Sequence, residues 1–145
     1  MPRVDRYYLE SRPEEPAVRN RFVCRLVEKA VRQGYRLVLQ VRDVAEAEAF
    51  DQLLWTFRDR SFIPHGREHN PRAPVWISLG EGDPEHYPLL VRVEPDHPAP
   101  EWARYDRIAE IVTPARRQSA ASQEREAAYR KAGFEFHQHD SKPAE

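Results

Sequence analysis

The sequence is poor in cysteine, which limits its covalent chemistry. Cys24 is the single cysteine among 145 residues, so the chain forms no internal disulfide. Its neighbours are apolar, Val23 and Leu26 among them. A catalytic thiol needs an electropositive and partly open setting. The sequence therefore predicts a buried structural thiol.

An excess of charge of either sign is also missing. Lysine and arginine number 23, and aspartate and glutamate 24, for a net charge of -1. Such a chain has no overall field to hold it on DNA or on an anionic membrane, so any contact with nucleic acid is expected to be local or indirect. No apolar run approaches the roughly 20 residues of a membrane span, and the first residues lack the apolar stretch of a signal peptide. We therefore expect a soluble, cytoplasmic protein.

Glycine is scarce, which argues against nucleotide binding. Phosphate-binding loops need glycines where the backbone approaches the ligand, as in GxxxxGK[ST] and GxGxxG. Neither pattern occurs. Gly34 stands where a predicted helix ends, which is the wrong end for a phosphate. No cofactor is expected.

The pattern of apolar residues indicates one α/β domain. It predicts helices from Ala17 to Gly34, from about Asp43 to Phe57 and over 115–132, and strands over 4–9, 35–41, 75–79, 89–93 and 108–112. Asp43 with Glu46 resembles a capping box, Thr113 with Pro114 an N-cap and N1 pair, and Gly133 a helix stop. The alternation of strands and helices predicts a sheet covered by helices.

The histidines offer one weak case for a metal. His65 and His69 have i, i+4 spacing, but they lie in a proline-flanked loop where helical spacing has no meaning. No cysteine or carboxylate nearby in the sequence completes a site. No metal is expected, although a small metal-dependent hydrolase or nuclease using His65, His69 and a carboxylate such as Asp83 stays open as an alternative.

Two surface features point to protein binding. Trp55 lies off the apolar stripe of its helix, and Phe62 follows in a loop; two neighbouring aromatics of this kind are typical interface anchors. The region of the last helix is basic, although a solvated helix face would look the same. Its cationic residues are Arg116, Arg117, Arg125, Arg130 and Lys131.

Several short motifs, taken together, resemble one known family. They are Tyr7-Tyr8-Leu9, residues 34–39 (GYRLVL), residues 51–57 (DQLLWTF), residues 61–65 (SFIPH), Glu110-Ile-Val112 and residues 125–134. Their order over roughly 130 residues resembles the chi subunit of bacterial DNA polymerase III. The D-x-x-LW and SF-x-PH elements are the most specific part of this likeness.

The resemblance implies a fold and a function. It implies a three-layer α/β/α domain over residues 1–136 with a central, largely parallel sheet. From the sequence itself, residues 137–145 are expected to form a disordered tail. The resemblance also implies a protein without catalysis of its own, an accessory part of a DNA-directed DNA polymerase, a nucleotidyltransferase complex that replicates DNA.

The resemblance further implies two partner surfaces. Residues matching Trp55 and Phe62 would bind the psi subunit of the clamp loader, or alternatively an XPD/Rad3-like helicase. A second surface would take the acidic C-terminal tail of single-stranded DNA-binding protein. Its residues would be Val112, Arg116, Arg117, Arg125, Tyr129, Arg130 and Gly133.

Three positions depart from the family pattern. Gln123 stands where an arginine is expected and Glu126 where an aromatic is expected, so the tail pocket should be weaker or rearranged. Arg92 stands where the family often has a small polar residue, and the sequence offers no role for it.

Overall fold

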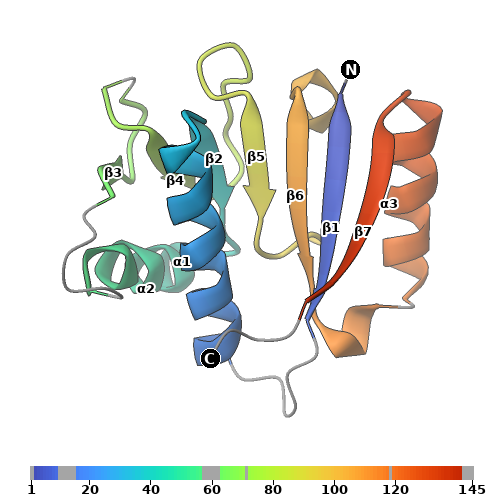
Figure 1. The fold of residues 1–145 in the computed structure, drawn as a ribbon, viewed down its shortest axis with the longest axis horizontal. Coiled ribbons are helices and arrows are strands. Elements are labelled where there is room, and N and C mark those ends of the chain that lie inside the picture. The colour runs from blue at the N-terminus through green and yellow to red at the C-terminus, as the bar shows by residue number, and fades with distance from the viewer. Residues whose placement is uncertain (1, 10–15, 57–62, 71, 118, 142–145) are drawn as a thin grey trace.

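The computed structural model describes residues 2–9, 16–56, 63–70, 72–117 and 119–141. The described chain is a single α/β domain with three α-helices and one sheet of seven parallel strands (Figure 1). Among these residues, no helix is long and apolar enough to cross a membrane. The strands are β1 (Arg3–Leu9), β2 (Leu37–Gln40), β3 (His65–Gly66), β4 (Val75–Ser78), β5 (Leu89–Arg92), β6 (Arg107–Val112) and β7 (Glu135–Ser141). The helices are α1 (Pro16–Arg32), α2 (Val44–Thr56) and α3 (Ala120–Lys131).

The order of the strands decides which face each connection covers. The order is β3-β4-β2-β5-β6-β1-β7. The connections carrying α1 and α2 step towards β3, whereas those leading into β4, β5, β6 and β7 step towards β7. Crossovers between parallel strands are nearly always right-handed, so the two directions of travel put their connections on opposite faces. The result is a three-layer α/β/α arrangement (Figure 1).

One face of the sheet forms the larger core with α1 and α2. Leu37 and Leu39 of β2 point to this face, because side chains alternate along a strand. They pack with Phe50 and Leu54 of α2 and with the α1 stripe around Cys24. Cys24 has no exposed surface, and burial raises the pKa of its thiol to about 12. The predicted buried thiol is confirmed.

The other face packs against α3 and against long loops. Val38 of β2 and Leu90 of β5 point to it, together with Tyr87, which precedes β5. Tyr129 of α3 and Phe134 close this second core. Trp102, in a short 3₁₀ turn between β5 and β6, meets the Tyr129 ring edge-on at 5.2 Å between centroids. This face also carries the buried polar groups described below.

Local signals placed several helix ends correctly. Asp43 Oδ1 accepts the amide N–H of Glu46 at 2.9 Å, which confirms the predicted cap. The Glu46 side chain reaches back to the amide of Arg42 at 2.8 Å, one residue before the cap rather than to the cap itself. Gly34 and Gly133 follow their helices with φ of 91° and 88°, which is the left-handed region that glycine adopts without strain.

The predicted start of the last helix was wrong. Thr113 and Pro114 open a 3₁₀ turn, Pro114–Arg116, and Thr113 makes no side-chain cap. α3 begins only at Ala120, where Ser119 Oγ accepts the amide N–H of Ser122 at 3.1 Å. A Thr-Pro pair can open either a 3₁₀ turn or an α-helix. Here the α-helix begins at the later position, because Ser119 caps it.

The predicted disorder from His137 onward was also wrong as far as Ser141. Residues 135–141 form β7, which pairs with β1 from Arg3↔Glu135 to Leu9↔Ser141. The strand is polar because it is the edge of the sheet, so its sequence lacks the apolar run of an inner strand. His139 stacks on Tyr7 at 4.7 Å between centroids and hydrogen-bonds Asp5 at 2.8 Å. β3, inside a predicted loop, was likewise missed.

Asp5 should make the fold sensitive to acid. Its burial favours a higher pKa, but hydrogen bonds from Arg3 and His139 and the charge of Arg107 hold the pKa below its ordinary 3.8. A carboxyl group whose pKa is lower in the folded state than in the unfolded state stabilises the fold at pH values above its unfolded pKa. This contribution is lost as the pH falls from about 4 through the folded pKa. Urea unfolding at about pH 7, 4 and 3 should show a weaker decline in stability for Asp5→Asn than for wild type. The same change at the exposed Asp106 should leave the decline unaltered.

Candidate interaction surfaces

A buried ion pair lies at the centre of the α3 side. Arg6 of β1 and Glu110 of β6 are opposite each other in the sheet, and their side chains are 1% and 0% exposed. Arg6 Nη2 lies 2.8 Å from Glu110 Oε1. The Tyr129 hydroxyl donates to Glu110 Oε2 at 2.6 Å. Burial raises the pKa of Tyr129 well above its ordinary value, so the phenol keeps the proton that it donates.

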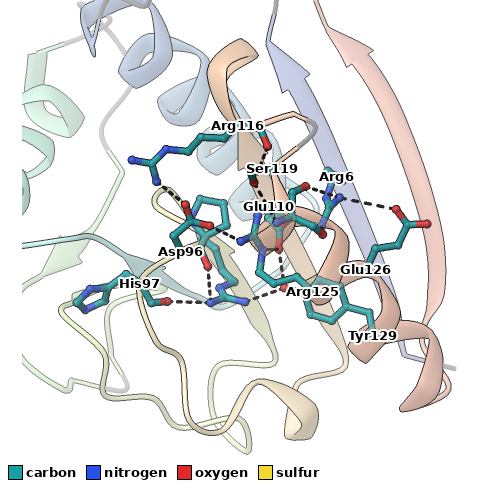
Figure 2. Close-up of polar contacts among 12 residues, drawn as sticks. Arg6, Asp96, His97, Glu110, Arg116, Ser119, Arg125, Glu126 and Tyr129 are labelled. Carbon is teal, nitrogen blue, oxygen red and sulfur yellow. Dashed lines mark hydrogen bonds and ion pairs between the residues drawn. The ribbon is translucent and has the colours of Figure 1, made fainter.

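Arg125 extends this buried group towards the surface. Its Nε donates to Glu110 Oε2 at 3.1 Å, and its Nη1 bonds Asp96. Arg116 reaches the other oxygen of Asp96 at 2.8 Å. Figure 2 shows the side chains of Arg125 and Arg116 converging on Asp96 from two elements. The side chain of Arg125 is only 13% exposed, so its guanidinium group mainly contacts residues of the domain itself.

Arg92, which the sequence left unexplained, belongs to the same group. Its Nη1 donates to the Tyr129 hydroxyl at 2.7 Å. Its Nη2 donates to the carbonyls of Pro95 and His97, both at 2.9 Å. Arg92 therefore holds the turn after β5 against α3. This turn carries Asp96, the partner of Arg116 and Arg125.

The predicted tail-binding residues fall into an exposed and a buried set. Arg116 and Arg117 are 42% exposed at their side chains and Arg130 is 57% exposed. Gly133 is also exposed. Val112 and Tyr129 are each 1% exposed. A ligand can reach the first set directly, whereas the second set lies beneath neighbouring side chains.

Two of the three exposed arginines lie over aromatic rings at the α3–β7 side. Arg117 stacks on Tyr8 at 4.3 Å from the ring centroid and pairs with Asp140 at 2.7 Å. Arg130 stacks on Phe136 at 4.8 Å and pairs with Glu126 at 3.1 Å. Stacking holds the guanidinium planes in place while their outer edges face solvent. We call Arg116, Arg117 and Arg130 the outer arginines.

Glu126 and Gln123, the two departures from the family pattern, lie on α3 itself. Glu126 is paired with Arg130, and its Oε1 is 3.9 Å from Arg6 Nη1 (Figure 2). Gln123 is exposed. Glu126 therefore neutralises part of the surface that an acidic ligand would meet.

The second predicted surface can be described only in part. Trp55, in the last turn of α2, is 54% exposed. Its ring meets His65 of β3 edge-on, with 5.4 Å between centroids. Phe62 lies outside the described residues. The exposure expected of an interface anchor is present at Trp55.

The histidines are arranged differently from the expected set. His65 turns its ring nitrogens to the carbonyl of Ile63 at 2.6 Å and to Asp51. His69 instead meets Asp83 at 2.8 Å, and His86 meets the same carboxylate. The structure thus places Asp83, the carboxylate named in the alternative, beside His69 but not beside His65, because the sheet brings distant loops together. The role of His86 had no signal in the sequence apart from its spacing of three from Asp83.

The carboxyl ends of β2 and β5, where ligands of open α/β sheets often bind, hold carboxylates. Arg19 of α1 pairs with Glu46 at 2.8 Å and with Glu94 at 3.3 Å. Glu46 and Glu94 are both buried. Arg42 also pairs with Glu94 at 3.1 Å, so two arginines balance the two carboxylates and the strand ends hold a charge-paired cluster.

Comparison with known families decides the assignment. The family model for the DNA polymerase III chi subunit, HolC, matches residues 1–137. The chain belongs to this chi family. A DNA polymerase III subunit chi from Pseudomonas aeruginosa is 38% identical over 142 residues, covering 96% of each chain. A probable DNA polymerase III subunit chi from Rickettsia prowazekii is 30% identical over 76 residues, or 50% of this chain and 46% of that one.

Chi family membership makes the chain similar to an accessory subunit of a DNA polymerase, as the resemblance had indicated. The match covers the sheet from β1 through the first residues of β7. It therefore includes both the buried Arg6–Glu110 group and the outer arginines.

Arg125 and Arg130 should differ sharply in their effect on stability. Arg125→Ala removes one partner of the buried Glu110, and we expect it to cost about 2 kcal/mol or more in free energy of unfolding. Arg130→Ala breaks an exposed i, i+4 pair and a stacking contact with Phe136, which together are worth about 1 kcal/mol. Denaturant titration of the two variants measures the difference. Equal losses would mean that Arg125 does not support the fold.

Proposed function

We propose that the protein is a non-catalytic adaptor of the DNA polymerase III holoenzyme, joining the clamp loader to single-stranded DNA-binding protein. The observation that carries this proposal is the chi family match over residues 1–137. In this proposal Trp55 and Phe62 bind the psi subunit, or a helicase of the XPD/Rad3-like kind. The outer arginines bind the acidic tail of single-stranded DNA-binding protein.

The electrostatics of the α3 side support an acidic peptide as the second ligand. Glu110 bonds both Arg6 and Arg125, while the buried Arg92 bonds the Tyr129 hydroxyl and two carbonyl groups, so the buried group itself leans positive. The outer arginines face solvent and offer N–H groups suited to carboxylates. Their present partners are exposed acidic side chains, which an incoming acidic tail can replace. The adaptor would thus reach DNA through a DNA-binding partner.

The apolar end of the tail meets a closed surface. Val112 and Tyr129, the expected apolar wall, are each 1% exposed. A terminal phenylalanine would contact them only after a covering side chain moves. Phe136, half-buried beneath Arg130, is an apolar group nearer the surface. Opening the pocket costs part of the binding energy, so we propose micromolar or weaker affinity. This corresponds to a binding free energy no larger than about 8 kcal/mol in magnitude.

The tail surface is tested by titrating a labelled acidic peptide ending in phenylalanine. Arg116→Ala and Arg130→Ala should each weaken binding up to about fivefold, because an exposed charge pair contributes at most about 1 kcal/mol. Raising the salt concentration should weaken wild-type binding, since exposed charges are screened. Arg32→Ala, an exposed arginine of α1, is the matched control and should bind as wild type does.

Identical affinity in wild type, Arg116→Ala and Arg130→Ala would contradict the assignment of the outer arginines. Binding that persists unchanged when the terminal phenylalanine of the peptide is replaced by alanine would contradict an apolar contact. Arg125→Ala is unsuitable as a binding test, because its buried bonds to Glu110 support the fold.

The Trp55 surface is tested separately with the psi subunit. Trp55→Ala should leave stability nearly unchanged, because the side chain is 54% exposed. It should weaken psi binding roughly thirtyfold, the effect of losing about 2 kcal/mol at an interface anchor. Gln52→Ala, an exposed change on the same helix, is the control and should bind normally. If both variants bind psi equally well, the end of α2 is not the interface.

A further inference from the structure

Three potential metal ligands converge on the face of the sheet that α3 also covers. His69 Nε2 and His86 Nδ1 each lie 2.8 Å from Asp83 Oδ2. The three ligand atoms all lie within 4.8 Å of one another. In the described part of the chain, this is the one place where three such groups meet.

The strand order explains why these residues meet. His69 lies in the connection from β3 to β4, and Asp83 and His86 lie in the connection from β4 to β5. Both connections step towards β7 in the sheet, so right-handed crossovers place them on the same face. The site is therefore a product of the fold rather than of spacing in the sequence.

Buried side chains hold the ligands in position. The His69 ring meets Trp76 edge-on at 5.1 Å and Tyr87 at 5.8 Å between centroids. The Tyr87 hydroxyl donates to the carbonyl of Asn70 at 2.6 Å, which fixes the loop beside His69. Tyr87 has no exposed surface and Trp76 is 6% exposed. A site on such supports keeps its geometry without a ligand.

The turn that carries Asp83 and His86 is also fixed. The carbonyl of Asp83 accepts the amide N–H groups of His86 at 3.2 Å and of Tyr87 at 2.8 Å. A Cβ atom at Gly82 would lie 2.0 Å from the Tyr105 hydroxyl, so the backbone and this tyrosine are closely packed. Asp83 Oδ2 faces both imidazole rings, so the carboxylate is placed to share an ion with them.

We infer that His69, Asp83 and His86 form a binding site for a divalent transition-metal ion of the zinc class. Imidazole nitrogen with carboxylate oxygen suits Zn²⁺, whereas Mg²⁺ prefers oxygen ligands alone. The ion would lie between the three ligand atoms, which would separate slightly around it; each imidazole would bind through the nitrogen that now faces Asp83 and carry its proton on the other ring nitrogen. Three protein ligands leave a fourth position for water or for a group from a partner. The side chains are 44%, 23% and 55% exposed, so that position faces solvent.

This site is independent of the proposed adaptor function. It would join the loop before β4 to the turn before β5, neither of which belongs to the outer arginines or to Trp55. A bound ion at a hundredfold excess over its dissociation constant would raise the ratio of folded to unfolded protein about a hundredfold.

The test is calorimetric titration of the metal-free full chain with Zn²⁺, alongside Mg²⁺ as comparator. We expect one Zn²⁺ per chain and no competition from Mg²⁺. His69→Ala, His86→Ala and Asp83→Asn should each weaken Zn²⁺ binding tenfold or more, because each removes one of three ligands. His137→Ala is the matched control, since His137 pairs with a single carboxylate, Glu135, and should bind as wild type does.

A second measurement keeps structural damage apart from ligand loss. Circular dichroism of each metal-free variant checks the fold, and Asp83→Asn preserves the shape of the side chain that it replaces. Nitrogen NMR of the imidazole rings should show Zn²⁺ shifting His69 Nε2 and His86 Nδ1. Failure of wild type to bind Zn²⁺, or equal binding by wild type and folded His86→Ala, would overturn the site.

Discussion

The ion pair between Arg6 and Glu110 is the contact on which the α3 side of the protein depends. The two residues are partners in the register of β1 and β6, and both side chains are almost fully buried. A shift of one residue would turn one charge to the opposite face and leave the other unpaired. Burying such a pair costs free energy, but leaving one of its charges without the other costs more, so the pair fixes the register of the two strands. It also positions α3, because the Tyr129 hydroxyl donates a hydrogen bond to Glu110.

This buried pair divides the arginines of the α3 side by function. Arg6, Arg92 and Arg125 bond groups inside the domain, where they position β1, β5 and α3. The outer arginines, in contrast, keep their charge at the surface. The net charge of -1 hides this division, because it sums buried and exposed charges alike. A near-neutral chain can therefore present a local basic surface to an acidic partner.

The direction of each crossover has a similar consequence for the rest of the molecule. Connections that step towards β3 place α1 and α2, with Trp55, on one side. Connections that step towards β7 gather α3 and the loops bearing His69 and His86 on the other. The proposed psi surface and the proposed tail surface thus belong to helices on opposite faces of the sheet. Partners bound at these two surfaces would not block each other.

Local features of the chain were determined by its sequence, and tertiary pairing decided the rest. Gly34, Gly133 and the Asp43 cap act through neighbouring residues, so the ends that they set were predictable. β7 was not, because an edge strand gains its stability by pairing with β1 across the chain rather than from an apolar run. The inward role of Arg125 and the approach of His86 to His69 and Asp83 had the same origin. Spacing along a sequence cannot encode contacts that only the strand order creates.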